Sequence, residues 1–239
     1  MDLSGPLFPA AWLWLSALAA AAVLAVAVRR APWWRLRDPV RLNAWLGAIV
    51  VLLLMWSMNA GVREGLNLHL LGASVATLMF GGPLALVALA VVILGSAING
   101  SIHWSALGLN LLVMAGIPVL LAERLRRFAE RRLPPNYFVY IFVQAFAGAG
   151  VGVILVGLAA TAALILVGAY PSRLLLDEYL PFFLLLAFSE AWMSGMAMTL
   201  MVVFRPAWVG SFEDKRYLAE SPGPSRGEHR DNTGDQGNE

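Results

Sequence analysis

Seven long runs of apolar residues, separated by short polar or arginine-rich segments, make up most of the chain. The first run, 8–28, contains no charged residue, and as a helix it can cross the about 30 Å hydrocarbon core of a bilayer. The pattern predicts an all-α, polytopic helical membrane protein with about seven transmembrane helices. The predicted spans are 8–28, 43–59, 66–80, 84–98, 105–122, 137–167 and 179–204. Hydrophobicity falls away beyond residue 205, so 206–239 is predicted to be a polar tail, largely disordered.

Arginine is concentrated in three of the segments that separate these runs. Five arginines lie in 29–41, five lie in 124–132, and three basic residues follow the last run within 205–216. With seven spans, all three segments fall on the same side of the membrane. Because short cytoplasmic loops are enriched in Lys and Arg, we expect the N-terminus outside and the C-terminal tail in the cytoplasm. The expected location is a bacterial cell (inner) membrane.

The composition narrows the range of functions. The chain of 239 residues is 59% hydrophobic and only 13% charged, with a mean hydropathy of +0.71, which is typical of a membrane protein. Cysteine is absent, which excludes disulfides and thiolate metal sites. Lysine occurs once, at Lys215, so the chain has no GxxxxGK[ST] phosphate-binding loop. Any ATP that drives transport must therefore be hydrolysed by another subunit. The lipid bilayer is an expected partner, and nucleic acid is not.

Polar side chains within the predicted spans are candidates for function. Glu190 lies near the middle of the last span, where an acidic group is disfavoured by roughly 2.5–3.5 kcal/mol. It is therefore expected to face the interior of the bundle and to have a partner there. It could relay protons or cations or bind a ligand, or it could only hold helices together by hydrogen bonds. Asn110 and Ser74 are further polar residues within spans.

Two histidines fall on the outer side in this topology. His69 opens the third predicted span and is followed by small residues that allow close packing, whereas His103 lies in the loop before the fifth span, beside Trp104. Imidazole is a common ligand of nickel, cobalt and zinc, so both are candidate metal ligands. Either could instead be an interfacial residue in contact with headgroups or water. They are 34 residues apart, and no metal-binding spacing joins them.

Small residues mark candidate contact faces on the last two spans. Gly148 and Gly152 are separated by three residues, and Gly195 follows Ala191 at the same spacing. This spacing lets a neighbouring helix approach closely, either within the bundle or from a partner protein.

Three stretches, in this order, carry a family resemblance. The first has a histidine near its start, then small residues and a Gly-Pro break; it reads LNLHLLGASVATLMFGGPLALVALAVV. The second contains Asn110, Met114 and Gly116 and reads GSIHWSALGLNLLVMAGIPVL. The third contains Glu190 and Thr199 and reads PFFLLLAFSEAWMSGMAMTLMVVF. Together they resemble the CbiM/NikM-type substrate-capture (S) components of energy-coupling-factor (ECF) transporters.

The resemblance implies a substrate-capture or permease subunit for a transition-metal cation, nickel or cobalt, with its metal site facing outside. It also implies a transmembrane coupling subunit and cytoplasmic ABC ATPases as partners. The metal is the substrate, and no permanently bound cofactor is expected. His69 matches the family's helix-borne metal ligand. In the family, the other ligands are the N-terminal amine and a histidine at the second position.

This chain departs from that pattern because its second residue is Asp2, whereas the family has a histidine at the second position. A carboxylate in place of imidazole weakens and hardens a nitrogen site. The chain therefore binds a different cation, builds its site from His69, His103 and Asp2, or has lost metal capture. Two other functions remain open: an accessory or structural protein of the same fold, and a proton-coupled carrier that uses Glu190. An enzyme is not expected, since no nucleophile and base share the same depth.

Overall fold

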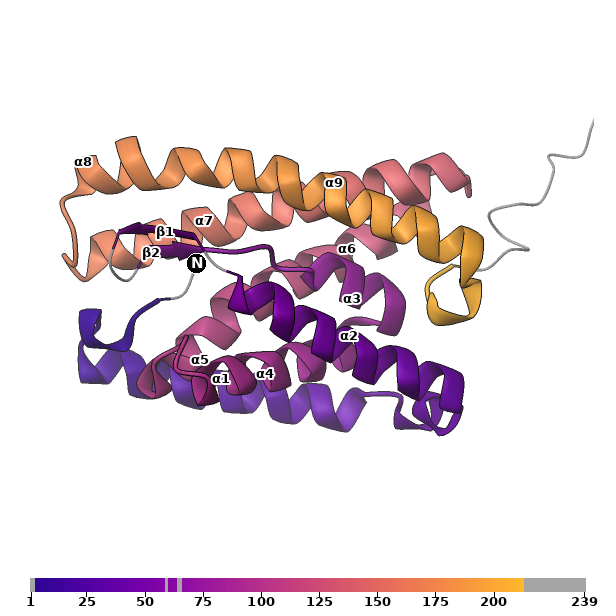
Figure 1. Cartoon of the computed structure of the whole chain (residues 1–239), viewed down its shortest axis with the longest axis horizontal. Coiled ribbons are helices and arrows are strands. Elements are labelled where there is room, and N and C mark those ends of the chain that lie inside the picture. Colours follow the sequence, from indigo (N-terminus) through magenta and orange to yellow (C-terminus); the bar gives the residue numbers. More distant parts are fainter. Residues whose placement is uncertain (1–2, 59, 64–65, 213–239) are drawn as a thin grey trace, which may run out of the picture.

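The computed structural model describes residues 3–58, 60–63 and 66–212. They form a bundle of long helices that run side by side, with one short two-stranded hairpin near one end (Figure 1). The predicted helical membrane fold is therefore confirmed.

The first half of the chain builds four helices and the hairpin. Two of the helices begin with a proline in the first turn, where its missing N–H group is not needed, and Asp38 caps one of them by accepting a hydrogen bond from Val40 N at 3.0 Å. The elements are η1 Gly5–Leu7, α1 Ala10–Arg30, η2 Trp33–Arg37, α2 Pro39–Ser57, β1 Ala60–Arg63, β2 Leu66–Leu68, α3 Ala73–Phe80 and α4 Gly82–Ile98.

The second half forms three long helices that contain π-helical turns. Such turns insert an extra residue into the helix and often accompany functional sites. The first helix comprises η3 Trp104–Ala106, α5 Leu107–Asn110, π-helical η4 Leu111–Gly116 and α6 Ile117–Arg132. The second comprises π-helical η5 Val139–Ala147 and α7 Gly148–Leu166. The third comprises α8 Ser172–Leu174, π-helical η6 Leu175–Tyr179 and α9 Leu180–Phe204, and η7 Pro206–Trp208 follows.

Within the described residues, five helices are long and apolar enough to cross a membrane: Ala10–Arg30, Pro39–Ser57, Trp104–Arg132, Val139–Leu166 and Ser172–Phe204. The apolar helix α4 is shorter, at 17 residues. Many large apolar side chains on the outside of the bundle are exposed, for example Trp14 at 72% and Leu184 at 70%. This arrangement suits a protein whose outer surface faces lipid.

The third predicted span, 66–80, is not one helix. Only α3 is helical, and the chain before it is extended from β2 as far as Gly72 (Figure 1). The non-helical part is held by Glu190 of α9, whose carboxyl oxygens accept hydrogen bonds from the Leu71 and Gly72 N–H groups. His69 therefore precedes the helix and does not lie on it.

Two further boundaries differ from the prediction. The basic segment 124–132 is helical and forms the last part of α6, where Glu123 and Arg127 pair across one turn at 3.0 Å. The described part of the predicted tail, 206–212, packs onto the end of the bundle. There Gly210 N donates to Met79 O at 2.8 Å, and the Phe212 side chain is buried. The remainder of the predicted tail, 213–239, lies outside the described residues.

Gly108 sets the distance between α1 and α5. A Cβ atom at this position would lie 2.5 Å from Ala17 Cα and 2.6 Å from Ala17 N, so it would collide with backbone atoms of α1. A collision with backbone cannot be relieved by a change of rotamer. The two helices would have to move apart.

We therefore expect Gly108→Ala to destabilise the protein by about 1–3 kcal/mol, the usual penalty for overpacking. Thermal unfolding in detergent, followed by tryptophan fluorescence, measures the effect. Gly47→Ala is the matched control, because no atom lies within 4 Å of the Cβ that it would add. Equal unfolding temperatures for the two variants would contradict the proposed contact.

Candidate metal centre

The extended segment 69–72 runs through the interior of the bundle, where its backbone polar groups need partners. A membrane-embedded segment without helical hydrogen bonds is tolerated only if protein or trapped water satisfies those groups. Glu190 supplies two acceptors: its carboxylate oxygens accept the Leu71 N–H at 2.8 Å and the Gly72 N–H at 2.7 Å. Trp56 Nε1 donates to Leu71 O at 3.2 Å. Side chains from α9 and α2 thus hold the segment in place.

Gly72 makes the turn from this extended segment into α3. Its φ angle is +65°, a left-handed conformation that glycine adopts without strain. A Cβ atom there would also lie 2.4 Å from Leu52 Cδ2 of α2. The left-handed turn therefore requires glycine, and any larger residue would also displace the Leu52 side chain.

His69 is 4% exposed, and its ring packs against Trp56 with the ring centroids 4.5 Å apart. Nδ1 lies 3.0 Å from Leu70 O. A carbonyl oxygen only accepts hydrogen bonds, so Nδ1 is the donor in this contact. Many metal-binding histidines are oriented in this way, with one nitrogen donating to a backbone carbonyl and the other facing the metal. His69 is thus a buried, oriented imidazole.

Asn110 fastens the N-terminal segment to the core. Leu3 N donates to Asn110 Oδ1 at 2.8 Å, and Asn110 Nδ2 donates to Leu3 O at 3.1 Å. Leu3 and Asn110 are both almost completely buried. The chain therefore enters the bundle at its N-terminal end instead of lying on its surface.

His103 occupies a different setting from His69. It is exposed, and its Nδ1 atom lies 2.8 Å from Ser105 Oγ, so it caps the turn that begins η3. The N-terminal segment passes close by, since a Cβ atom on Gly5 would lie 2.8 Å from His103 Nδ1. Asp2, the third predicted metal ligand, lies outside the described residues. Among the residues that are described, no group of three or more His, Cys, Asp or Glu side chains could hold a metal ion.

A mostly apolar groove of about 430 Å³ lies between α2, α3 and α9. Glu190 and Gly72 line it, so the groove reaches the point where α9 holds the extended segment. Small residues such as Gly47 and Ala197 form part of its walls.

Comparison with known proteins identifies the family. Residues 3–208 match the CbiM family, described as the cobalt uptake substrate-specific transmembrane region. The chain belongs to this family. It is accordingly a membrane component of the cobalt uptake family, as the resemblance predicted, and not an enzyme. A search of curated proteins gives no match.

Two solved structures share the fold of this CbiM-family chain. A truncated transition metal transporter has a TM-score of 0.74 and 17% sequence identity, covering 85% of this chain and 99% of its own. A second transition metal transporter has a TM-score of 0.72 and 17% identity, covering 85% of this chain and 93% of its own.

The other predicted site residues of the CbiM-family chain lie at helix contacts. Ser74 is buried on α3, with its Oγ atom 3.8 Å from the position of a Cβ on Gly152. A Cβ on Gly148 would lie 2.8 Å from Leu125 of α6, and one on Gly195 would lie 3.3 Å from Phe146 of η5. These glycines face neighbouring helices of the same bundle.

Trp56 is the site residue that the sequence does not reveal. It contacts His69 through its ring and Leu71 through its indole N–H group. In the sequence it is one aromatic residue within a long apolar run, like other tryptophans of the chain. Only the fold of the CbiM-family chain distinguishes it from them.

Proposed function

We propose that the chain is the substrate-capture subunit of an energy-coupling ABC-type uptake system for a transition-metal cation, cobalt or nickel, in a bacterial inner membrane. The observation that carries this proposal is the buried imidazole of His69, oriented by Leu70 O and Trp56 within a non-helical segment. Membership of the CbiM family supports it. Nitrogen ligands suit both cations.

The N-terminal segment supplies the rest of the site in this proposal. Asn110 holds Leu3 inside the bundle, one residue from Asp2. A carboxylate at Asp2 would make the site harder than one built from nitrogen alone. Glu190 acts by holding the backbone beside His69, and it does not bind the metal.

Metal titration of the purified protein tests the proposal. We expect cobalt or nickel to bind more tightly than micromolar, and we expect His69→Ala to lower the affinity at least tenfold, because changes even outside the first ligand shell cost 10–100-fold. Isothermal titration calorimetry gives the affinity, and elemental analysis after dialysis gives the metal content. His103→Ala should change the affinity less than threefold, since His103 is exposed and caps a turn.

Two results would contradict the metal assignment: binding no tighter than micromolar for any transition metal, or an unchanged affinity in His69→Ala. The coupling to ATPases needs a separate test, because the chain has no phosphate-binding loop of its own. Metal uptake by cells that express this chain should depend on a coexpressed coupling subunit and ATPase. Uptake by this chain alone would refute that part of the proposal.

A further inference from the structure

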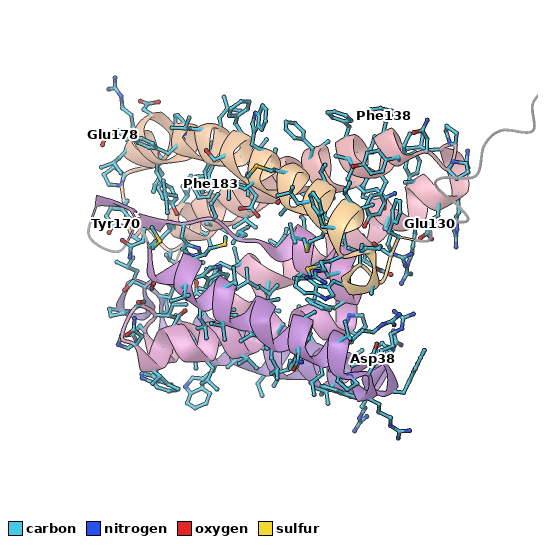
Figure 2. The ribbon with its side chains drawn as sticks, turned by 45° about the vertical axis from the view of Figure 1, so that its right-hand side comes forward. Asp38, Glu130, Phe138, Tyr170, Glu178 and Phe183 are labelled. Carbon is cyan, nitrogen blue, oxygen red and sulfur yellow. The ribbon has the colours of Figure 1, made fainter. Side chains whose placement is uncertain are left out.

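A second cavity lies at the end of the bundle where the arginine-rich segments meet. It has a volume of about 410 Å³ and is lined by Arg30, Arg35, Glu123, Arg126, Arg127 and Glu130, together with the turn at 81–83 and residues 210–211. We call it the arginine pocket. Figure 2 shows Glu130 and Asp38 at this end of the bundle, with Tyr170 and Glu178 at the opposite end.

The charges in the arginine pocket do not balance. Four arginines face two glutamates, which leaves a net charge of +2. The glutamates are engaged with α6 itself, because Glu123 pairs with Arg126 at 2.9 Å and with Arg127 at 3.0 Å, and Glu130 pairs with Arg126. Arg30 and Arg35 form no ion pair within the described part of the chain. The excess positive charge therefore comes from α1 and η2.

Two features of the pocket favour an anion. The Nε atom of Arg35 is buried and has no hydrogen-bond partner among the described residues, and such an unpaired donor is unfavourable unless a ligand accepts from it. The N-terminus of α4, at Gly82, also opens into the pocket and has no side-chain cap. Unpaired N–H groups at a helix start attract negative charge.

The position of the pocket favours the phosphate of a lipid. Trp33 and Trp34, directly before Arg35, are 43% and 64% exposed, as expected for aromatic residues at the membrane interface. The Arg35 guanidinium lies over the Trp34 ring, 5.4 Å from its centroid. Basic pockets between helices at this depth bind the headgroups of anionic lipids.

We propose that the arginine pocket binds a phosphate group, supplied by the headgroup of an anionic phospholipid and held by Arg30 and Arg35. This site lies at the arginine-rich end, and it does not depend on metal capture. Free inorganic phosphate offers the same chemistry, so the test must separate the two sources.

Native mass spectrometry of the full chain in detergent tests the proposal, with phosphatidylglycerol added as the probe and phosphatidylcholine as the neutral comparison. We expect one phosphatidylglycerol to be retained. Arg35→Gln should weaken its binding about fivefold, and Arg30→Gln with Arg35→Gln about thirtyfold, given about 1 kcal/mol for each basic residue near a lipid surface. Arg37→Gln is the matched control, because Arg37 belongs to the same element, is exposed and does not line the pocket.

A second arm uses inorganic phosphate alone and measures the unfolding temperature of lipid-free protein. Stabilisation by phosphate that is lost in the double variant, without retention of lipid, would assign the pocket to free phosphate. Equal retention of phosphatidylglycerol by the double variant and by Arg37→Gln would overturn the proposal. Retention of phosphatidylcholine as strong as that of phosphatidylglycerol would do the same. Arg35→Lys, which keeps the positive charge, should retain most of the binding and exclude a general loss of folding.

Discussion

Glu190→Ala is expected to destabilise the protein by about 2–5 kcal/mol and to lower its metal affinity more than tenfold. The variant removes both acceptors from Leu71 N–H and Gly72 N–H, and each buried donor left without a partner costs about 1–3 kcal/mol. The segment that carries His69 would then lose its attachment to α9. Thermal unfolding gives the stability, and hydrogen exchange of a peptide that contains 69–72 should rise.

Two variants control for this effect. Ser189→Ala changes the neighbouring residue, which is half-buried and donates a hydrogen bond to Leu185 O of its own helix, so little change is expected. Glu190→Gln keeps one acceptor oxygen and should show an intermediate loss of stability and affinity. A Glu190→Gln protein with wild-type metal affinity and no uptake would instead favour a proton carrier. Normal exchange at 69–72 in Glu190→Ala would contradict the proposed attachment.

The position of Glu190 explains how an acidic residue is accommodated within the bundle. It is 2% exposed, and its two carboxyl oxygens face backbone N–H groups rather than lipid. The same groove of about 430 Å³ that Glu190 lines separates α2 from α9. A movement of α9 relative to α2 would therefore act directly on the extended segment. In this way the backbone beside His69 is coupled to the packing of the last helix.

Hydrophobic runs predict most of the fold, because each long helix is a continuous apolar stretch. The predicted spans 8–28 and 179–204 agree closely with Ala10–Arg30 and with α9. The third span could not be predicted in this way, since an apolar run has the same composition whether it is extended or helical. What decides its conformation is the hydrogen bonding of Leu71 and Gly72 to Glu190, a residue about 120 positions away.

The candidate site was predictable only in part, for a related reason. His69 and Glu190 are conspicuous because charged or titratable groups are rare within apolar runs. Their relationship is not visible in the sequence, because neither periodicity nor spacing connects α9 with the segment before α3. Asn110 is conspicuous for its polarity, but its partner is the backbone of Leu3, which no side-chain pattern reveals.

Asn110→Leu tests whether the N-terminal segment takes part in metal capture. Leucine has a similar size but cannot bond to Leu3, so the buried N–H and C=O groups of Leu3 lose their partners. We expect the N-terminal segment to detach, the metal affinity to fall at least tenfold, and the free energy of unfolding to fall by about 2–4 kcal/mol. Titration of cobalt and nickel measures the first effect, and thermal unfolding measures the second.

The matched control is Asn99→Leu, at an exposed asparagine whose Nδ2 atom makes only a long contact with Ser101 Oγ at 3.5 Å. It should leave both quantities unchanged. Proteolysis adds a readout that general instability would not reproduce, because a detached N-terminal segment is cleaved before the helices at a temperature where the bundle is still folded. If Asn110→Leu loses stability but keeps its metal affinity, the N-terminal segment is only a structural plug, and the ligands that accompany His69 come from elsewhere in the chain.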